Sequence, residues 1–246
     1  MKNQTRWAAT KFELHRGRWR GSRDSGELGV GSRLISDLVA AQYQAHLPTH
    51  ARGRLLDLGC GKAPLYGAYA PHVSEVTCVD WAPGDYIDLH CDLSRPLPFE
   101  AGRFDTIVLS DVLEHIPEPA LLWGEMARVL APGGKIIMNV PFYYSVHAHP
   151  HDYYRYTNFA IERFASLNGL KLVQLQAVGG INEIFADLLA KALSKLPLLG
   201  PPLATGLQTL ARAFVRTGPG ARIARVSSRH FPLGYFMIAQ REGEAA

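Results

Sequence analysis

The sequence predicts an α/β fold: a doubly wound, mostly parallel seven-stranded sheet with an N-terminal helical extension and a helical insertion before the last strand. Two observations predict this fold. Short apolar runs recur along the chain, and segments with helical apolar spacing separate them. Strands that alternate with helices form parallel sheets whose faces the helices cover. The 246 residues can bury a core without disulfides. The three cysteines follow no metal-ligand spacing, which suits a reducing cytoplasm.

The strands and helices of the main domain can be assigned in chain order. A first helix is predicted over residues 28–47, where apolar residues have helical spacing, and Pro48 is expected to end it. Five runs are then predicted as strands: GRLLDLGC, EVTCVD, YIDLHCDL, FDTIVLSD and GGKIIMNVP. A helix is predicted within EPALLWGEMARVLAPGG, before the fifth strand. The runs KLVQLQAV and GYFMIAQ supply two later strands.

The last two strands are separated by a long connection, residues 180–233. Apolar residues recur at helical spacing from Ile184 to Leu196 and again from Leu203 to Val215, so two amphipathic helices are predicted. A connection of this length with its own periodicity indicates a lid or a docking element. We therefore divide the chain into a basic N-terminal extension with a helix, 1–50, and a main domain, 51–246, that contains the insertion.

Charge is distributed unevenly along the chain. Residues 1–25 and residues 183–230 each carry seven Lys/Arg and two acidic residues, whereas residues 26–182 carry eleven basic and sixteen acidic ones. The basic segments are either solvated surface or contacts for an anionic partner such as phosphate, a lipid headgroup or RNA. The sequence shows neither a signal peptide nor the roughly 18 apolar residues of a membrane span. We expect a cytoplasmic protein, with peripheral membrane contact through 183–230 as a hypothesis.

The stretch LLDLGCGKAP is the strongest functional signal. An apolar strand breaks at Gly59, Gly61 lets the backbone approach a ligand, and a helix is predicted to start near Pro64, so backbone amides and a helix dipole would face an anionic group. Pro64 occupies the sixth position of G-x-G-x-x-G, which argues against a dinucleotide site. Asp57 would repel a pyrophosphate but suits an ammonium group. Asp80 ends the second strand, where a carboxylate accepts both hydroxyls of a ribose.

A ligand with an amino acid end and a nucleoside end fits both carboxylates, and here the chain resembles the class I S-adenosylmethionine (SAM)-dependent methyltransferases of the Methyltransferase-11-like type. CDLSRPLPFEAGRFDTIVLSDVLEHIPEP and MARVLAPGGKIIMNVP resemble the same family, over about residues 53–160 and the last strand. The resemblance implies SAM as the cofactor and a Rossmann-like sheet. For each residue that the resemblance singles out, a purely structural role is the alternative interpretation. The cofactor-binding residues that it implies are Asp57, Gly59, Gly61, Asp80, Trp81, Asp92, Leu93 and Ser110.

The segment HAHPHDYYRYT, residues 147–157, follows the fifth strand, at the sheet edge where ligands of doubly wound folds bind. A phenol is almost fully protonated at neutral pH, and a histidine that titrates near neutrality can accept its proton. We predict catalytic roles for His149, His151 and Asp152, with one histidine as general base and Asp152 orienting an imidazole ring.

Other roles of this segment remain open. It could bind and orient the substrate, or it could be structural, with Asp152 paired to Arg155 and Thr157 capping the next helix. A metal site is a further alternative, since H-x-H-x-H with an aspartate offers suitable ligands. No metal ligand is predicted, because methyl transfer needs no metal and Pro150 stiffens the run.

The sequence thus predicts a SAM-dependent methyltransferase that acts on a hydroxyl oxygen of a small-molecule, sugar or lipid-linked acceptor. Segments like HPHDYYRYT are common in methyltransferases of glycan or secondary-metabolite biosynthesis, and the basic segments favour an anionic or carrier-linked acceptor. One alternative is a SAM-binding regulatory or assembly protein without catalysis. Another is an RNA methyltransferase, which is disfavoured because an NPPY-type motif and an RNA-binding module are missing. A DNA partner is not expected, and the oligomeric state is left undetermined.

Overall fold

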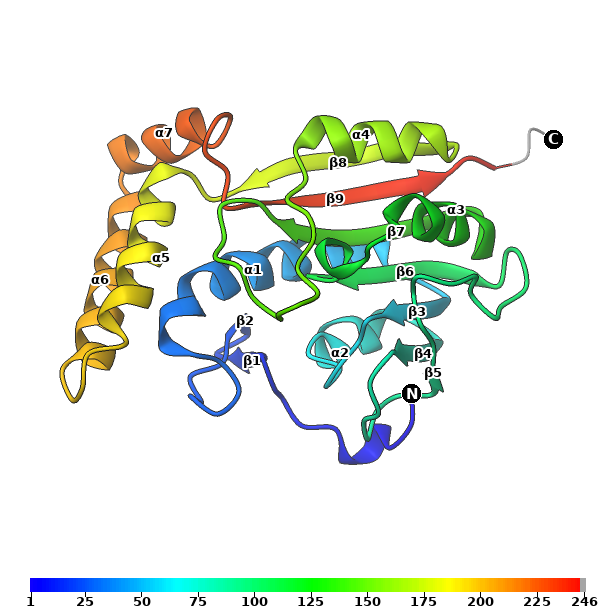
Figure 1. Cartoon of the computed structure of the whole chain (residues 1–246), viewed down its shortest axis with the longest axis horizontal. Helices are drawn as coiled ribbons and strands as arrows, with labels where there is room; N and C mark the ends of the chain where they lie inside the picture. The colour runs from blue at the N-terminus through cyan, green and yellow to red at the C-terminus, as the bar shows by residue number, and fades with distance from the viewer. Residues whose placement is uncertain (244–246) are drawn as a thin grey trace. The chain divides into compact units, whose positions relative to one another are not determined.

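The computed structural model describes residues 1–243, which fold as two compact units (Figure 1). Unit 1 comprises Met1–Ala8, Ala45–Gln176 and the chain from Tyr235 onward. Unit 2 comprises Ala9–Gln44 and Ala177–Gly234. Each unit joins segments that are far apart in the sequence, so tertiary packing decides which segments belong together.

The main sheet has seven strands in the order β5-β4-β3-β6-β7-β9-β8. The pairs β3–β4, β3–β6, β4–β5 and β6–β7 are parallel, and Figure 1 shows β9 running opposite to its neighbours. This arrangement confirms the predicted fold class, and each of the seven strands overlaps a run assigned from the sequence, although β7 begins three residues before its predicted run. The strands are β3 (Arg54–Leu58), β4 (Glu75–Asp80), β5 (Leu89–His90), β6 (Phe104–Ser110), β7 (Leu130–Pro141), β8 (Leu170–Val178) and β9 (Gly234–Arg241).

The central strands are buried on both faces. In β6 the consecutive residues Ile107, Val108 and Leu109 are all fully buried, and Leu55 and Leu56 in β3 are as well. Neighbouring residues of a strand point to opposite faces, so both faces of the sheet must be covered. This is why these strands appear in the sequence as continuous apolar runs rather than as alternating ones.

The helices differ from the predicted ones in several places. The four-residue α2 begins at Tyr66, later than the start expected near Pro64. Helix α1 continues past Pro48, contrary to the prediction, because the amide of Ala51 still donates to the carbonyl of Leu47 at 2.9 Å and Leu47 is buried. The insertion forms three helices rather than the two predicted. The helices are α1 (Arg33–His50), α2 (Tyr66–Tyr69), α3 (Pro119–Val129), α4 (Asn158–Leu167), α5 (Ile181–Leu193), α6 (Gly200–Val215) and α7 (Gly218–Ser227), with short 3-10 helices at Gln4–Arg6, Val30–Ser32, Ala70–His72 and Leu113–His115.

The N-terminal extension contains a β-hairpin that the sequence analysis missed. Strands β1 (Phe12–His15) and β2 (Arg18–Gly21) pair antiparallel, with His15 opposite Arg18. The two loop residues, Arg16 and Gly17, have φ angles of 50° and 75°. Positive φ at both positions is the geometry of the tight turns that suit a hairpin twist, and Gly17 adopts it without strain.

Polar contacts tie unit 2 together around Asp37 of α1. Its carboxylate accepts hydrogen bonds from the Gly21 amide at 2.9 Å and from Arg23 at 2.9 Å, and it pairs with Arg212 of α6. The hairpin, the first half of α1 and the helical insertion therefore share one partly buried carboxylate. Among the described residues, no helix is long and apolar enough to cross a lipid bilayer.

Gly59 is expected to be the least replaceable residue of the turn after β3. Its φ is 68°, and a Cβ there would lie 2.5 Å from a methyl carbon of Val112. Gly59→Ala should lower the free energy of unfolding by about 3 kcal/mol, measured by urea denaturation, because backbone strain and overpacking add.

The matched control is Gly61→Ala. Its φ is also positive, at 52°, but an added Cβ would meet no atom within 4 Å, so only about 1 kcal/mol of strain is expected. Adding Val112→Ala should lessen the cost of Gly59→Ala but not that of Gly61→Ala. Equal costs for the two glycines would contradict the packing explanation.

Candidate active site

The turn after β3 is fastened to the end of β4 by its own amides. The amides of Gly59 and Cys60 both donate to the carbonyl of Val79, at 2.8 and 3.1 Å. The amide of Gly61 donates to Oδ2 of Asp80 at 2.8 Å. These three amides are therefore engaged within the protein, which corrects the expectation that they face a ligand. Because α2 has a single turn, its dipole contributes little, and the side chains must supply the binding chemistry.

Asp57 is a buried carboxylate at this edge of the sheet. The hydroxyl of Tyr69 donates to its Oδ2 at 2.7 Å. Burial raises the pKa of Asp57 to about 7, the hydrogen bond from Tyr69 opposes that rise, and the negative charge of Asp80 adds to it. A carboxylate held in this way gains most from a cationic group placed against it.

Asp80 ends the neighbouring strand with its carboxylate fixed in place. Oδ1 accepts from the amide of Ala82 at 3.0 Å, and Oδ2 accepts from Gly61. Each carboxylate oxygen has a second lone pair, so Asp80 can still accept hydrogen bonds from a ligand. Trp81, the next residue, has 68% of its surface exposed and can cover a ring bound beside Asp80.

The remaining residues predicted to bind the cofactor lie at or just after the ends of β5 and β6. Asp92 is exposed, and its Oδ1 accepts from the amide of Ser94 at 2.9 Å, while Leu93 is buried. The hydroxyl of Ser110, the last residue of β6, donates to Oδ1 of Asn139 in β7 at 2.9 Å. Parallel strands end at one edge, so these residues and the turn after β3 share it.

The first residues of the chain contact this turn, which the sequence analysis did not foresee. The indole of Trp7 donates to the carbonyl of Ala63 at 2.9 Å, and its ring centroid lies 5.4 Å from that of Tyr66. The hydroxyl of Tyr66 in turn donates to Gln4 at 3.3 Å. The only sequence signal was a tryptophan in a polar stretch.

The predicted catalytic histidines occupy different environments. His149 is exposed, and no hydrogen bond or ion pair of its ring is found within residues 1–243. The Nδ1 atom of His151 lies 3.0 Å from the hydroxyl of Tyr153. The His151 ring meets Trp81 edge to face, with centroids 5.1 Å apart. The segment after β7 therefore contacts the residue that follows Asp80.

Asp152 has a structural partner. Arg155 donates to both of its oxygens, at 2.5 and 2.7 Å, and these bonds hold the pKa of Asp152 well below its usual range. The hydroxyl of Thr157 accepts from the Ala160 amide at 3.2 Å and caps α4. Both contacts confirm the structural alternative considered for this segment. The imidazole beside Asp152 belongs to His147, whose Nδ1 lies 3.3 Å away, rather than to His149 or His151.

Glu114 and His147 were not singled out in the sequence, yet packing brings them together and raises the pKa of both. Glu114 is fully buried, and its Oε1 lies 3.7 Å from Nε2 of His115 and 3.7 Å from Nε2 of His147. These separations are those of ion pairs, longer than hydrogen bonds. Burial raises the pKa of Glu114. The interaction with Glu114 raises the pKa of His147 against the opposing effect of partial burial.

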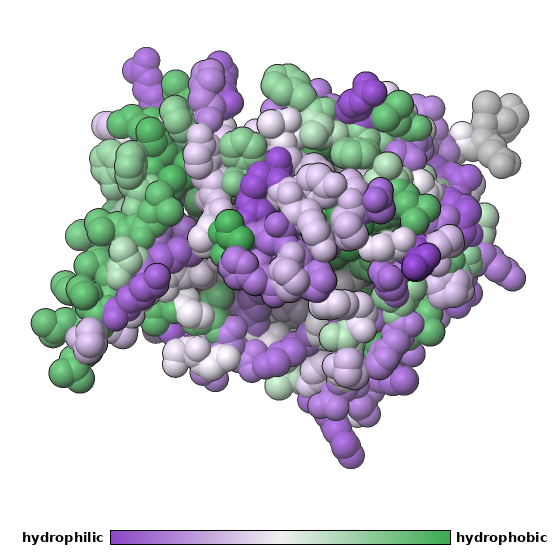
Figure 2. Space-filling view, viewed as in Figure 1, coloured by the Kyte–Doolittle hydropathy of each residue, from purple (hydrophilic) through white to green (hydrophobic). Residues whose placement is uncertain are grey.

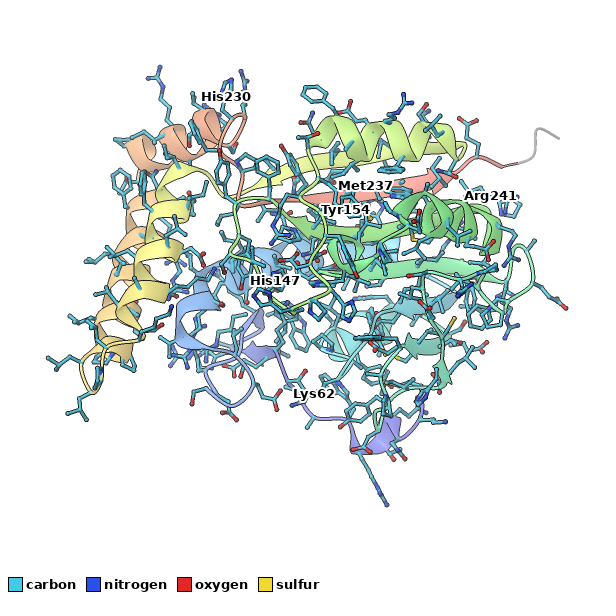
Figure 3. All side chains as sticks on the ribbon, viewed as in Figure 1. Lys62, His147, Tyr154, His230, Met237 and Arg241 are labelled. Atoms are coloured by element: carbon cyan, nitrogen blue, oxygen red, sulfur yellow. The ribbon has the colours of Figure 1, made fainter. Side chains whose placement is uncertain are left out.

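The backbone of Glu114 also anchors the segment that carries the histidines. Its carbonyl accepts from the amides of Tyr153 and Tyr154, at 2.9 and 3.2 Å. His115 donates through Nδ1 to the carbonyl of His151 at 2.6 Å, and Figure 3 labels His147 and Tyr154 on this segment. The 3-10 helix Leu113–His115 thereby fixes residues 147–157 above the ends of β6 and β7.

This group of side chains can act in two ways. Raised pKa values make the imidazole and the carboxylate stronger bases than the free side chains, so a member of the pair in its unprotonated form can take a proton from a bound hydroxyl. One ligand atom from each of Glu114, His115 and His147 also lies within 4.8 Å of the others. One carboxylate with two imidazoles is a donor set that suits a divalent transition metal.

Comparison with known protein families agrees with this geometry. Residues 56–138 match the family model described as a methyltransferase domain. The match identifies this segment as similar to a methyltransferase domain. It contains the turn after β3, Asp80, Ser110 and Glu114, whereas residues 147–157 lie outside it.

The chain also resembles proteins named as O-methyltransferases. It is 32% identical over 115 residues to the ubiquinone biosynthesis O-methyltransferase of Xanthomonas axonopodis pv. citri (strain 306), covering 41% of this chain and 48% of that protein. The chain thus spans about half the length of the curated relatives it matches.

Solved structures share the fold at low sequence identity. The [4+2]-cyclase SpnF has a TM-score of 0.55 at 15% identity, covering 85% of this chain and 83% of that one. Geranyl diphosphate methyltransferase in complex with SAM has a TM-score of 0.54 at 17% identity, covering 89% and 93%. At these identities the likeness concerns the fold alone.

The pairing of Glu114 with His147 can be tested directly. Glu114→Gln keeps the shape of the side chain and removes its charge, so the pKa of His147 should fall toward its ordinary value, measured by NMR titration of the ring protons. Glu118→Gln, an exposed change four residues away, is the control and should leave that pKa unchanged. If the pKa of His147 were unchanged in Glu114→Gln as well as in Glu118→Gln, the pairing would be contradicted.

Proposed function

We propose that the chain binds SAM and transfers its methyl group to a hydroxyl oxygen of a small-molecule or carrier-linked acceptor. The observation that carries the proposal is the pair of carboxylates, Asp57 and Asp80, at the same end of the parallel strands β3 and β4. The methyltransferase domain match over 56–138 and the O-methyltransferase relatives support it.

The residues of this edge fit the chemistry of SAM. The buried Asp57, whose pKa is raised to about 7, would be neutralised by the ammonium of the methionyl part. Asp80 retains lone pairs for the ribose hydroxyls. An added Cβ at Gly61 would meet no atom within 4 Å, so the turn leaves room for a ligand there. The largely exposed Trp81 would supply apolar surface for an adenine ring, whereas Leu93, at 5% exposure, would offer little.

Bound SAM supplies a methyl group that its positively charged sulfur already activates for transfer. The protein must therefore align the acceptor and remove its proton. In this proposal the pair of Glu114 and His147 takes that proton, because both pKa values are raised and the pair lies on the segments that follow β6 and β7. Asp152 and the carbonyl of Ser145, 3.3 and 3.1 Å from Nδ1, hold the imidazole ring in position.

The proposal is tested by incubating the protein with a metabolite extract and deuterated-methyl SAM. Mass spectrometry should detect a hydroxyl compound that gains the labelled methyl group. SAM binding without any labelled product would instead support a regulatory protein, or a different reaction on this fold such as the cyclisation named for SpnF.

The affinity for SAM should rise with pH in a way that depends on Asp57. The ammonium binds the ionised carboxylate, so affinity should increase as pH rises through about 7 and fall again when the ammonium loses its proton near pH 8. Isothermal titration calorimetry measures this profile. Asp57→Asn should weaken binding about 10- to 100-fold and flatten the rise.

Tyr69→Phe provides the matched variant for that profile. It removes the hydrogen bond that lowers the pKa of Asp57, so the rise in affinity should move to higher pH. A wild-type affinity that is independent of pH, or a Tyr69→Phe profile displaced to lower pH, would count against the role of Asp57.

Alanine variants separate the candidate bases once an acceptor is known. His147→Ala should lower kcat about 100-fold and leave the affinity for SAM unchanged, whereas His149→Ala should retain turnover. His151→Ala tests the base predicted from the sequence. If His149→Ala or His151→Ala lost turnover while His147→Ala kept it, the assignment to the Glu114 and His147 pair would be wrong.

A further inference from the structure

Helices α5 and α6 of unit 2 present large apolar side chains to solvent. On α5 these are Phe185, Leu188 and Leu189, and on α6 they are Leu203, Leu210 and Phe214. Their spacings of three, four and seven residues place each set on one face of its helix. A continuous apolar face of this kind marks an interaction surface in a folded protein.

Apart from Ile184 on α5, the buried residues of these two helices are small or polar. Ala186 and Ala190 are buried on α5, and Ala204 is buried on α6. Asp187 and Gln208 are buried with them, and Gln208 donates to the carbonyl of Val30 at 2.8 Å. A helix whose outer face meets only water normally buries its leucines against the protein. Here the large apolar side chains lie on the outer face instead, which indicates that this face contacts a partner.

The connection between the two helices is apolar as well. Leu196 and Leu199 are exposed, and Leu198 is 94% exposed. Figure 1 shows α5 and α6 side by side with this connection at their tip. Figure 2 shows hydrophobic residues gathered over both helices and the tip.

The exposed charges on α5 to α7 and their connections are exclusively positive. Lys195, Arg216, Arg222, Arg225 and Arg229 are exposed. Both acidic residues of the segment, Glu183 and Asp187, are buried. The surface therefore combines apolar side chains with a cationic border, the pattern of helices that lie in the interface of an anionic bilayer.

We propose that the α5–α6 hairpin and α7, residues 181–230, dock onto the surface of an anionic lipid bilayer. The apolar tip and outer faces enter the headgroup region while Lys195 and the exposed arginines contact anionic lipid phosphates. A second copy of the chain fits less well, because a symmetric contact through this face would bring like charges together. The docking does not depend on methyl transfer.

Vesicle flotation tests the docking with the full-length protein. Vesicles of phosphatidylcholine mixed with phosphatidylglycerol should carry the protein upward, those of phosphatidylcholine alone should carry much less, and high salt should weaken the binding. Failure to float with both vesicle types at low salt would overturn the proposal.

Paired variants identify the surface. Leu198→Ser with Leu199→Ser changes only the exposed connection and should weaken binding at least tenfold, since two apolar side chains are lost from the bilayer. Arg222→Gln with Arg225→Gln should weaken it about fivefold per arginine and reduce the salt dependence. The controls Leu167→Ser and Arg163→Gln alter exposed residues of α4 in unit 1 and should bind like the wild type.

Two other outcomes decide against the proposal. If light scattering shows a dimer that Leu198→Ser with Leu199→Ser dissociates, and vesicles do not bind, the face is an interface between copies. If the control variants lose vesicle binding as strongly as the hairpin variants, the contact lies elsewhere. Circular dichroism and an unchanged affinity for SAM show that each variant is folded.

Discussion

The site depends on the way the end of β4 captures the turn that follows β3. Parallel pairing places Asp57 opposite Cys78 and Leu58 opposite Val79. The carbonyl of Val79 and the carboxylate of Asp80 then take the amides of residues 59–61. The chain must turn sharply to reach these acceptors, which requires the positive φ of Gly59. One set of hydrogen bonds thus shapes the turn and fixes the Asp80 carboxylate while leaving Asp57 buried beside it.

Glu114 plays a comparable part at the next strand. Its carbonyl holds the amides of Tyr153 and Tyr154, and its carboxylate lies against His147. A buried charge of this kind costs free energy unless partners compensate it. Burial raises the pKa of Glu114, and the interaction with Glu114 raises the pKa of His147. The same residue therefore links the position of the histidine segment to its proton affinity.

Unit 2 is held together by a different constraint. Asp37 joins the hairpin and α6 through charged hydrogen bonds, and small residues let the helices approach closely. Gly31, for example, has no room for a Cβ beside Lys191. With the polar and small residues used inside, the large apolar side chains remain on the outside. This distribution gives the insertion a surface that the fold of unit 1 does not require.

The sequence by itself determined the seven strands and the mostly parallel class of their sheet, because strands buried on both faces of a parallel sheet form apolar runs. It did not give the order of the strands or the reversed direction of β9. It also located Asp57 and Asp80, since their places at strand ends depend only on local pattern. Tertiary structure decided the rest. Which of the clustered histidines meets a buried carboxylate depends on residues more than thirty positions apart, and local spacing favoured His149 and His151 where packing brought Glu114 to His147. The hairpin at Arg16 and Gly17 and the outward-facing leucines of α5 were likewise beyond pattern alone, because helical spacing defines an apolar face but not whether that face packs against the protein or points away from it.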